Sequence, residues 1–110
     1  MVIAVREYRS VDGVSPFARW FAGLNTPAAL KVRTAIARLE AGNLSNTKSV
    51  GRSVFEYRID FGPGYRVYFG NDGERLIILL AGGTKRRQRN DIETAHAYWA
   101  DYKARKRRET

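Results

Sequence analysis

The spacing of hydrophobic residues changes along the chain, and these changes divide it into predicted elements. β-Branched and aromatic residues cluster over residues 2–8 and predict a first strand. Apolar residues then recur at helical spacing over 15–24 and 27–41. Each of these stretches starts at a hydroxyl residue followed by proline, a pattern typical of helix N-termini, and Gly42 is the expected stop of the second. The first part of the chain therefore predicts a strand followed by a helical hairpin.

The pattern shifts to a period of two after a polar stretch at 43–51, which is expected to be a loop. Two strands are predicted at 54–61 and 65–69, joined by a Gly-Pro-Gly turn. A third strand, at 75–81, is apolar at nearly every position, so we expect it to lie inside the sheet with both faces covered.

A last helix is predicted over 91–103, where apolar residues return to helical spacing. Asn90 and Glu93 form a capping-box pattern at its start. The element order is thus β-α-α-β-β-β-α. It predicts an α+β domain in which the N-terminal helical hairpin and the C-terminal helix pack on an antiparallel sheet.

The length of 110 residues fits one domain, 1–110, and the basic tail at 104–110 is a candidate for disorder. No apolar run is long enough to cross a bilayer, and the N-terminus lacks a signal-peptide pattern. We therefore expect a cytoplasmic protein without a membrane partner. The chain has no cysteine and only one histidine, so no disulfide, metal site or cofactor is expected.

The net charge of +9 comes from two short clusters, at 85–89 and 103–110, and the rest of the chain is close to neutral. Such clusters attract phosphate backbones or acidic protein segments. We interpret the second cluster as a solvated tail. The first lies between predicted elements, which favours a functional role.

Strand alternation separates an aromatic face from a polar face in the middle hairpin. The polar face, expected to be open, contains Glu56, Arg58, Asp60, Arg66 and Tyr68. Arginines beside a tyrosine can bind phosphate and stack a base. The same residues could equally form cross-strand ion pairs on a solvated sheet. The pattern alone leaves both interpretations open.

The stretch VFEYRIDFGPGYRVYF, residues 54–69, resembles the signature of bacterial toxins of the RelE/ParE superfamily, and most closely the HigB-like addiction module killer branch. The run LLAGGTK at 79–85, followed by Gln88 and Asp91-Ile92, is similar to the second signature of that branch. The resemblance extends over nearly the whole chain, and the predicted order of elements agrees with the fold of that superfamily.

This resemblance implies the toxin of a type II toxin–antitoxin pair. Many such toxins cleave messenger RNA without a metal, usually on the ribosome. The ribose 2′-hydroxyl attacks the adjacent phosphate and leaves a cyclic phosphate and a 5′-hydroxyl. A cognate antitoxin, commonly with a helix-turn-helix domain, holds the toxin inactive, and the complex binds its own promoter DNA. Two alternatives stay open: a ParE-like inhibitor of DNA gyrase, or a nucleic-acid-binding accessory protein.

The resemblance also implies roles for individual residues. Arg66 matches the arginine that stabilises the phosphate, Arg58 matches a basic position on the preceding strand, and Lys85 and Arg86 match a basic pair after the glycine-containing bend. A reaction of this kind needs cations around the phosphate and a group that moves protons.

The chain departs from the superfamily pattern at two places. Asp60 stands where ribosome-dependent relatives often have a second lysine, and no tyrosine follows the basic cluster before Tyr98. The single histidine, His96, is expected at the surface rather than as a base. Because arginine is a poor base, the candidates for proton transfer are Glu56, Asp60, Tyr68 and Lys85.

Overall fold

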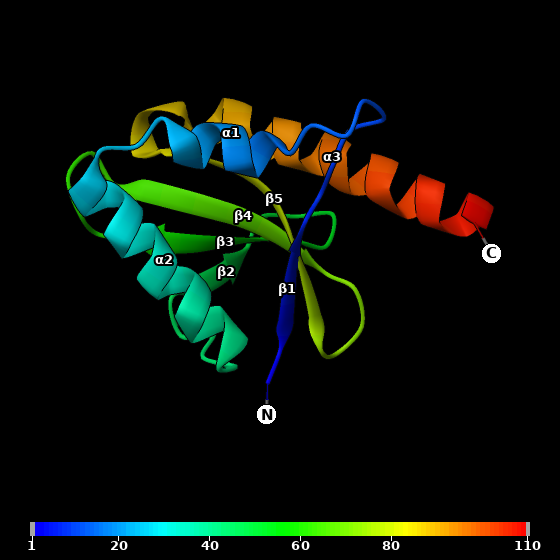
Figure 1. Ribbon diagram of the computed structural model, residues 1–110, viewed down its shortest axis with the longest axis horizontal. Helices are drawn as coiled ribbons and strands as arrows, with labels where there is room; N and C mark the ends of the chain where they lie inside the picture. The colour runs from blue at the N-terminus through cyan, green and yellow to red at the C-terminus, as the bar shows by residue number, and fades with distance from the viewer. Residues whose placement is uncertain (1, 110) are drawn as a thin grey trace.

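Two hydrophobic clusters, one on each face of a five-stranded sheet, organise the computed structural model, which describes residues 2–109. The elements in chain order are β1 (Ala4–Glu7), α1 (Pro16–Ala22), α2 (Thr26–Glu40), β2 (Thr47–Ser49), β3 (Val54–Ile59), β4 (Tyr65–Asn71), β5 (Leu76–Thr84), the 3-10 turn η1 (Lys85–Arg87) and α3 (Gln88–Glu109). Helices α1 and α2 lie over one face of the sheet and α3 over the other (Figure 1). The predicted α+β class, with helices packed on a sheet, is confirmed.

The strands are ordered β1-β5-β4-β3-β2, and all pairs are antiparallel except β1 with β5. The expectation of a wholly antiparallel sheet is therefore wrong at β1. This strand is separated from β5 by two helices and three strands, so no tight turn imposes an antiparallel pairing. The predicted loop at 43–51 is also wrong in part, because it contains β2. All three residues of β2 are polar, so the strand has no hydrophobic period.

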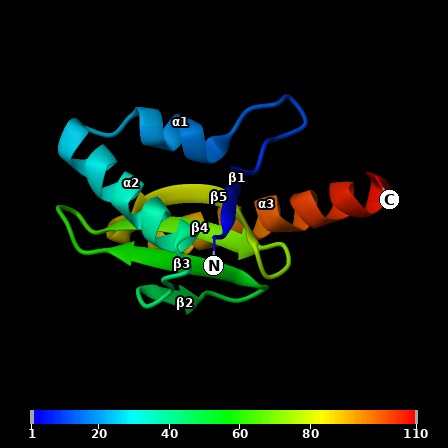
Figure 2. The same cartoon turned by 60° about the horizontal axis from the view of Figure 1, so that its bottom comes forward.

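Helices α1 and α2 begin with side-chain caps. The Ser15 hydroxyl accepts a hydrogen bond from the Ala18 amide at 3.0 Å, as its place before proline predicts. The cap of α2 is Asn25, one residue before the expected threonine, and its Oδ1 accepts from the Ala28 amide at 2.9 Å. Both helices pack on the aromatic face of the middle hairpin, and Figure 2 shows α2 crossing β3 and β4.

Strand β5 is buried on both faces, as its apolar sequence predicts. Ile77 and Leu79 join the cluster under α1 and α2, whereas Ile78 and Leu80 join the cluster under α3. Trp99 of α3 lies directly on Gly70 of β4, where a Cβ would be 2.6 Å from the indole ring. A side chain at Gly70 would thus push α3 off the sheet.

Helix α3 is longer at both ends than the sequence predicts. It follows η1 without a break and starts at Gln88, so Asn90 lies inside the helix and is not its cap. It continues through 104–109, within the tail of 104–110 that is a candidate for disorder, and Thr110 lies outside the described residues. The extension is anchored by Lys106, whose Nζ lies 2.6 Å from Asp72 Oδ1. Within residues 2–109, no helix is both long and apolar enough to cross a membrane.

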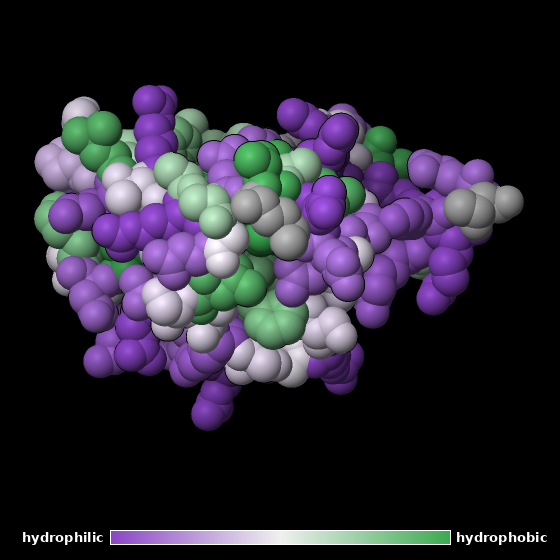
Figure 3. Space-filling view, turned by 90° about the horizontal axis from the view of Figure 1, so that it is seen from below, coloured by the Kyte–Doolittle hydropathy of each residue, from purple (hydrophilic) through white to green (hydrophobic). Residues whose placement is uncertain are grey.

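Hydrophilic side chains cover most of the face seen from below, and hydrophobic ones form small groups among them (Figure 3). The two hydrophobic clusters therefore lie mainly inside the molecule, between the sheet and its helices.

Candidate functional site

The polar face of the middle hairpin is not open, and this expectation is wrong. Glu56, Arg66 and Tyr68 are buried, at 0%, 4% and 0% exposure, whereas Arg58 and Asp60 are exposed. The cause is α3, whose apolar residues Ala95 and Trp99 pack on the apolar strands of the same face. Its first turns then cover the polar side chains of β3 and β4, a consequence that strand alternation alone does not reveal.

The sheet register arranges this face in two rows. Lys48 of β2 lies opposite Glu56, which lies opposite Tyr68. In the next row Arg58 lies opposite Arg66, which lies opposite Gly83 of β5. Both rows point to the same side of the sheet, so three cations, Lys48, Arg58 and Arg66, lie around the carboxylate of Glu56. Lys48 was missed in the sequence because its strand was interpreted as a loop.

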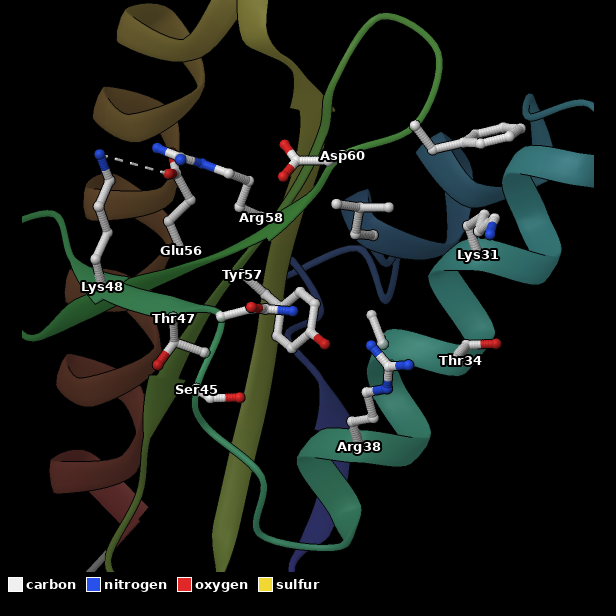
Figure 4. A pocket seen from close by; sticks show the side chains of 14 residues that line it. Lys31, Thr34, Arg38, Ser45, Thr47, Lys48, Glu56, Tyr57, Arg58 and Asp60 are labelled. Atoms are coloured by element: carbon white, nitrogen blue, oxygen red, sulfur yellow. Dashed lines mark ion pairs between the residues drawn. The ribbon is translucent and has the colours of Figure 1, made fainter.

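Glu56 is the centre of these contacts. Its Oε1 lies 3.7 Å from Arg66 Nε and 3.8 Å from Lys48 Nζ, and its Oε2 accepts a hydrogen bond from Gln88 Nε2 at 2.7 Å. We call Lys48, Glu56, Arg66 and Gln88 the Glu56 cluster. Figure 4 shows the Lys48–Glu56 ion pair with Arg58 beside it, both cations extending from the strand edge.

Several atoms of this region are buried without a hydrogen-bond partner among the described residues. They are Glu56 Oε1, Arg66 Nε, Tyr68 OH and Asp91 Oδ2, together with Trp99 Nε1 farther along α3. Removal from water raises the pKa of Tyr68, and the nearby Glu56 charge raises it further. Burial likewise raises the pKa of the Asp91 carboxyl, and the positive charge of Arg87 opposes this shift. A protonated, neutral Tyr68 is therefore favoured at neutral pH.

Glycines allow the basic segment after β5 to approach the cluster. Gly83 leaves room for Asp91, because a Cβ there would lie 1.9 Å from the carboxylate Oδ2. Gly64, at φ +79°, accepts a hydrogen bond from the Lys85 amide at 2.8 Å. A Cβ on Gly64 would lie 3.3 Å from Lys85 Cβ and 3.6 Å from Arg66 Nη1. The turn between β3 and β4 thus brings Lys85 close to Arg66.

The predicted site residues therefore fall into three groups. Buried under the start of α3 are Glu56, Arg66 and Tyr68. Exposed at the edge of β3 are Arg58 and Asp60, and exposed on η1 are Lys85 and Arg86. The structure does not bring all of them to one open surface.

His96 is half-buried rather than at the surface, and its Nε2 lies 3.0 Å from the Val50 carbonyl oxygen. This contact joins α3 to the loop after β2, so His96 has a structural partner away from the Glu56 cluster. Residues 2–109 contain no group of three or more histidine, cysteine or acidic residues that could hold a metal ion.

A groove of about 490 Å³ opens at the edge of β3 next to the Glu56 cluster. Its charged lining residues are Lys31 and Arg38 of α2, Lys48 of β2, and Glu56, Arg58 and Asp60 on the β3 side. Figure 4 shows α2 on one side of the groove and the β3 residues on the other.

Comparison with known proteins identifies a sequence relative and similar solved structures. No family model matches the chain. An uncharacterized protein of Haemophilus influenzae is 46% identical over 80 residues, which cover 72% of this chain and 81% of that protein. The two proteins belong to the same family. A chain of the archaeal RelE–RelB complex from Pyrococcus horikoshii has a TM-score of 0.54 at 16% identity, over 79% of this chain and 99% of that one. The fold is therefore RelE-like.

Proposed function

From the RelE-like fold and the sequence motif at residues 54–69, we propose that this protein is the toxin of a type II toxin–antitoxin pair and cleaves messenger RNA. The motif at residues 54–69 favours the HigB-like branch. The proposed site of action is the cytoplasm, with messenger RNA as the substrate.

The observation that carries this proposal is the group of cations on the polar side of β2, β3 and β4. Lys48 and Arg58 extend to the surface from adjacent strands, and Arg66 lies beneath them. Two exposed cations at one strand edge suit a phosphate group, and guanidinium can bind two of its oxygens at once. Arg66 and Glu56 then act mainly by holding Lys48 in position.

The neighbouring 2′-hydroxyl loses its proton to solvent water as it attacks, and negative charge builds up on the phosphate as the new P–O bond forms and the bond to the 5′ oxygen breaks. Lys48 and Arg58 would stabilise this charge. Of the candidate proton carriers, Glu56 and Tyr68 are buried, whereas Asp60 and Lys85 are exposed. Lys85, held beside Arg66 by the Gly64 turn, is the accessible group to protonate the leaving 5′ oxygen, with Arg86 next to it.

The proposed partner is an antitoxin encoded next to this gene. The similar archaeal structure is a RelE–RelB complex, which supports a protein partner for this fold. An acidic or amphipathic antitoxin segment would be complementary to the exposed cations. Binding of promoter DNA through a helix-turn-helix antitoxin is part of the same proposal.

The test is induced expression in a bacterial host, followed by mapping of RNA 5′ ends. We expect growth arrest and new 5′-hydroxyl ends inside coding regions. The double variant Lys48→Ala/Arg58→Ala should reduce cleavage by about 10²-fold or more, because each lost charge contact to a transition state costs on that order.

The matched control is Arg19→Ala/Arg75→Ala, which removes two exposed cations elsewhere and should cleave like the parent. Growth arrest with intact RNA, together with loss of supercoiling by purified gyrase, would contradict the nuclease and indicate a gyrase inhibitor.

A further inference from the structure

The groove beside α2 continues directly from the cations assigned to the scissile phosphate. Lys48 and Arg58 line it, and they also belong to the proposed catalytic face. From there the groove passes over the edge of β3 to Lys31 and Arg38 on α2 (Figure 4). A strand of RNA bound at Lys48 and Arg58 therefore has a connected path into this groove.

The path exists because β2 is short. It begins at Thr47, opposite Tyr57, and just before it the Asn46 carbonyl oxygen accepts a hydrogen bond from the Arg58 amide at 3.1 Å. Among residues 2–109, no strand pairs with the rest of the β3 edge, through Asp60. A longer β2 would close the groove, so the polar three-residue strand that the sequence pattern missed shapes this surface.

The lining combines the groups that a nucleotide needs. Two cations of α2 are exposed, and the Arg38 guanidinium makes no hydrogen bond or ion pair within the described residues. Apolar surface comes from Phe61, which is half-buried with the Lys31 ammonium 5.3 Å from its ring centroid. Neutral hydrogen-bonding groups come from Thr34, Ser45 and Asn46. The volume of about 490 Å³ lies in the range of small-ligand sites.

Asp60 indicates which chemical groups the ligand of this groove must present. Its carboxylate is exposed, lies on the same side of β3 as Arg58, and forms no hydrogen bond or ion pair within residues 2–109 (Figure 4). A carboxylate only accepts hydrogen bonds, so it needs a ligand that offers N–H groups. An acidic peptide would place its own carboxylates against Asp60, whereas a base would present amino and imino donors. Among the bases, guanine offers two adjacent N–H donors on its Watson–Crick edge, which match two carboxylate oxygens.

We propose that this groove binds a guanosine of single-stranded RNA next to the cleaved bond. Lys31 and Arg38 contact its phosphate, Phe61 offers apolar surface to the base, and Asp60 accepts hydrogen bonds from the Watson–Crick edge. This inference rests on the proposed ribonuclease function and adds a specificity-determining residue to it. Asp60, a candidate proton carrier in the sequence, thereby becomes the residue that selects the flanking base.

The experiment measures kcat/KM of the purified protein on short RNAs that differ only in the base on either side of the cleaved bond. We expect the parent to prefer guanosine at one flanking position. Asp60→Asn should reduce this preference about 10-fold or more, since a good bidentate contact contributes about 1–3 kcal/mol of discrimination. It should leave cleavage of the poorer RNAs nearly unchanged. Asp12→Asn, at an exposed loop position, is the matched control.

A second pair of variants tests the phosphate contacts. Lys31→Ala/Arg38→Ala should lower kcat/KM on the longer RNAs and leave a dinucleotide substrate unaffected. Unchanged preference in Asp60→Asn, with active parent enzyme, would overturn the subsite and leave the nuclease intact. The subsite would also be overturned if Lys31→Ala/Arg38→Ala cleaved RNA normally but was no longer neutralised by the antitoxin. The groove would then be a docking surface for a protein. Absence of cleavage by the parent would overturn the proposed function and the subsite together.

Discussion

Arg66 is the residue at which family resemblance and structure differ most. The resemblance assigns it to the substrate phosphate, yet its side chain is only 5% exposed and lies against the buried Glu56 carboxylate. Each of these buried charges stabilises the other, because a buried charge without an ion-pair partner lowers the stability of the fold far more than a buried pair does. Arg66 therefore has a structural role whatever it contributes to RNA cleavage.

We expect Arg66→Ala to lower the free energy of unfolding by about 3–5 kcal/mol, since it leaves the buried Glu56 carboxylate without its buried cation and with Lys48, which is half exposed, as its remaining ion-pair partner among the described residues. Replacing both partners, in Arg66→Met/Glu56→Met, should cost clearly less. Urea denaturation of the parent, of Arg66→Met, of Glu56→Met and of the double variant measures this coupling. Equal losses in Arg66→Ala and in the double variant would contradict it. For the same reason, loss of toxicity in Arg66→Ala could result either from lost catalysis or from lost folding. Lys48 and Arg58 are exposed, so their substitution tests catalysis without removing the buried pair.

At the scale of elements, α3 is held differently at its two ends. Its C-terminal half makes close polar contacts: the Tyr8 hydroxyl donates to Asp101 Oδ2 at 2.7 Å, and the Tyr102 hydroxyl donates to Asp72 Oδ2 at 2.6 Å. Its first turns cover Glu56 Oε1, Arg66 Nε and Tyr68 OH, which are buried without a hydrogen-bond partner among the described residues. The Gln88–Glu56 hydrogen bond joins these turns to β3. The C-terminal half of α3, which lies away from the Glu56 cluster, is thus the part of the helix that is firmly attached to the rest of the molecule.

This attachment predicts a loss of stability in acid. Hydrogen bonds from Lys106 and then Tyr102 lower the pKa of the Asp72 carboxyl below its ordinary value. The stabilisation is therefore complete above the ordinary aspartate pKa of about 4 and is lost as the pH falls through the lowered value in the folded protein. Asp72→Asn should reduce the difference in urea midpoint between pH 6 and pH 3, as measured by circular dichroism. Asp12→Asn, on an exposed loop, should retain the parent's full difference.

The sequence predicts the elements with a clear period and misses those without one. Helices α1 and α2 and strands β3, β4 and β5 follow from apolar spacing and turn residues. Strand β2 has no apolar residue, so only pairing with β3 reveals it, and Lys48 was missed with it. The cover over Glu56 depends on how α3 docks, which no local pattern contains. The available signals were Gly70 and Gly83, each inside a strand, since glycines there indicate close approach of another element; Trp99 and Asp91 of α3 lie against them.

For the whole molecule, the net charge of +9 matters less than its location. Two cations of the basic C-terminus hold α3 in place: the Arg105 guanidinium donates a hydrogen bond to the Arg9 carbonyl oxygen, and Lys106 pairs with Asp72. The cations of the groove come instead from α2, β2 and β3, segments that the charge clusters of the sequence do not include. Folding therefore assembles a basic surface from scattered residues.

This assembly predicts how RNA binding responds to salt. Each phosphate contact to single-stranded RNA adds about −0.7 to the slope of log affinity against log salt, because bound counterions are released. Lys31→Ala/Arg38→Ala removes the proposed contacts to one phosphate and should make the slope shallower by about 0.7. Arg19→Ala/Arg75→Ala removes the same net charge from other surfaces and should keep the parent's slope. Fluorescence anisotropy with a short labelled RNA between 50 and 200 mM salt distinguishes the two. Equal slopes in both variants would mean that overall charge, and not the groove, attracts the RNA.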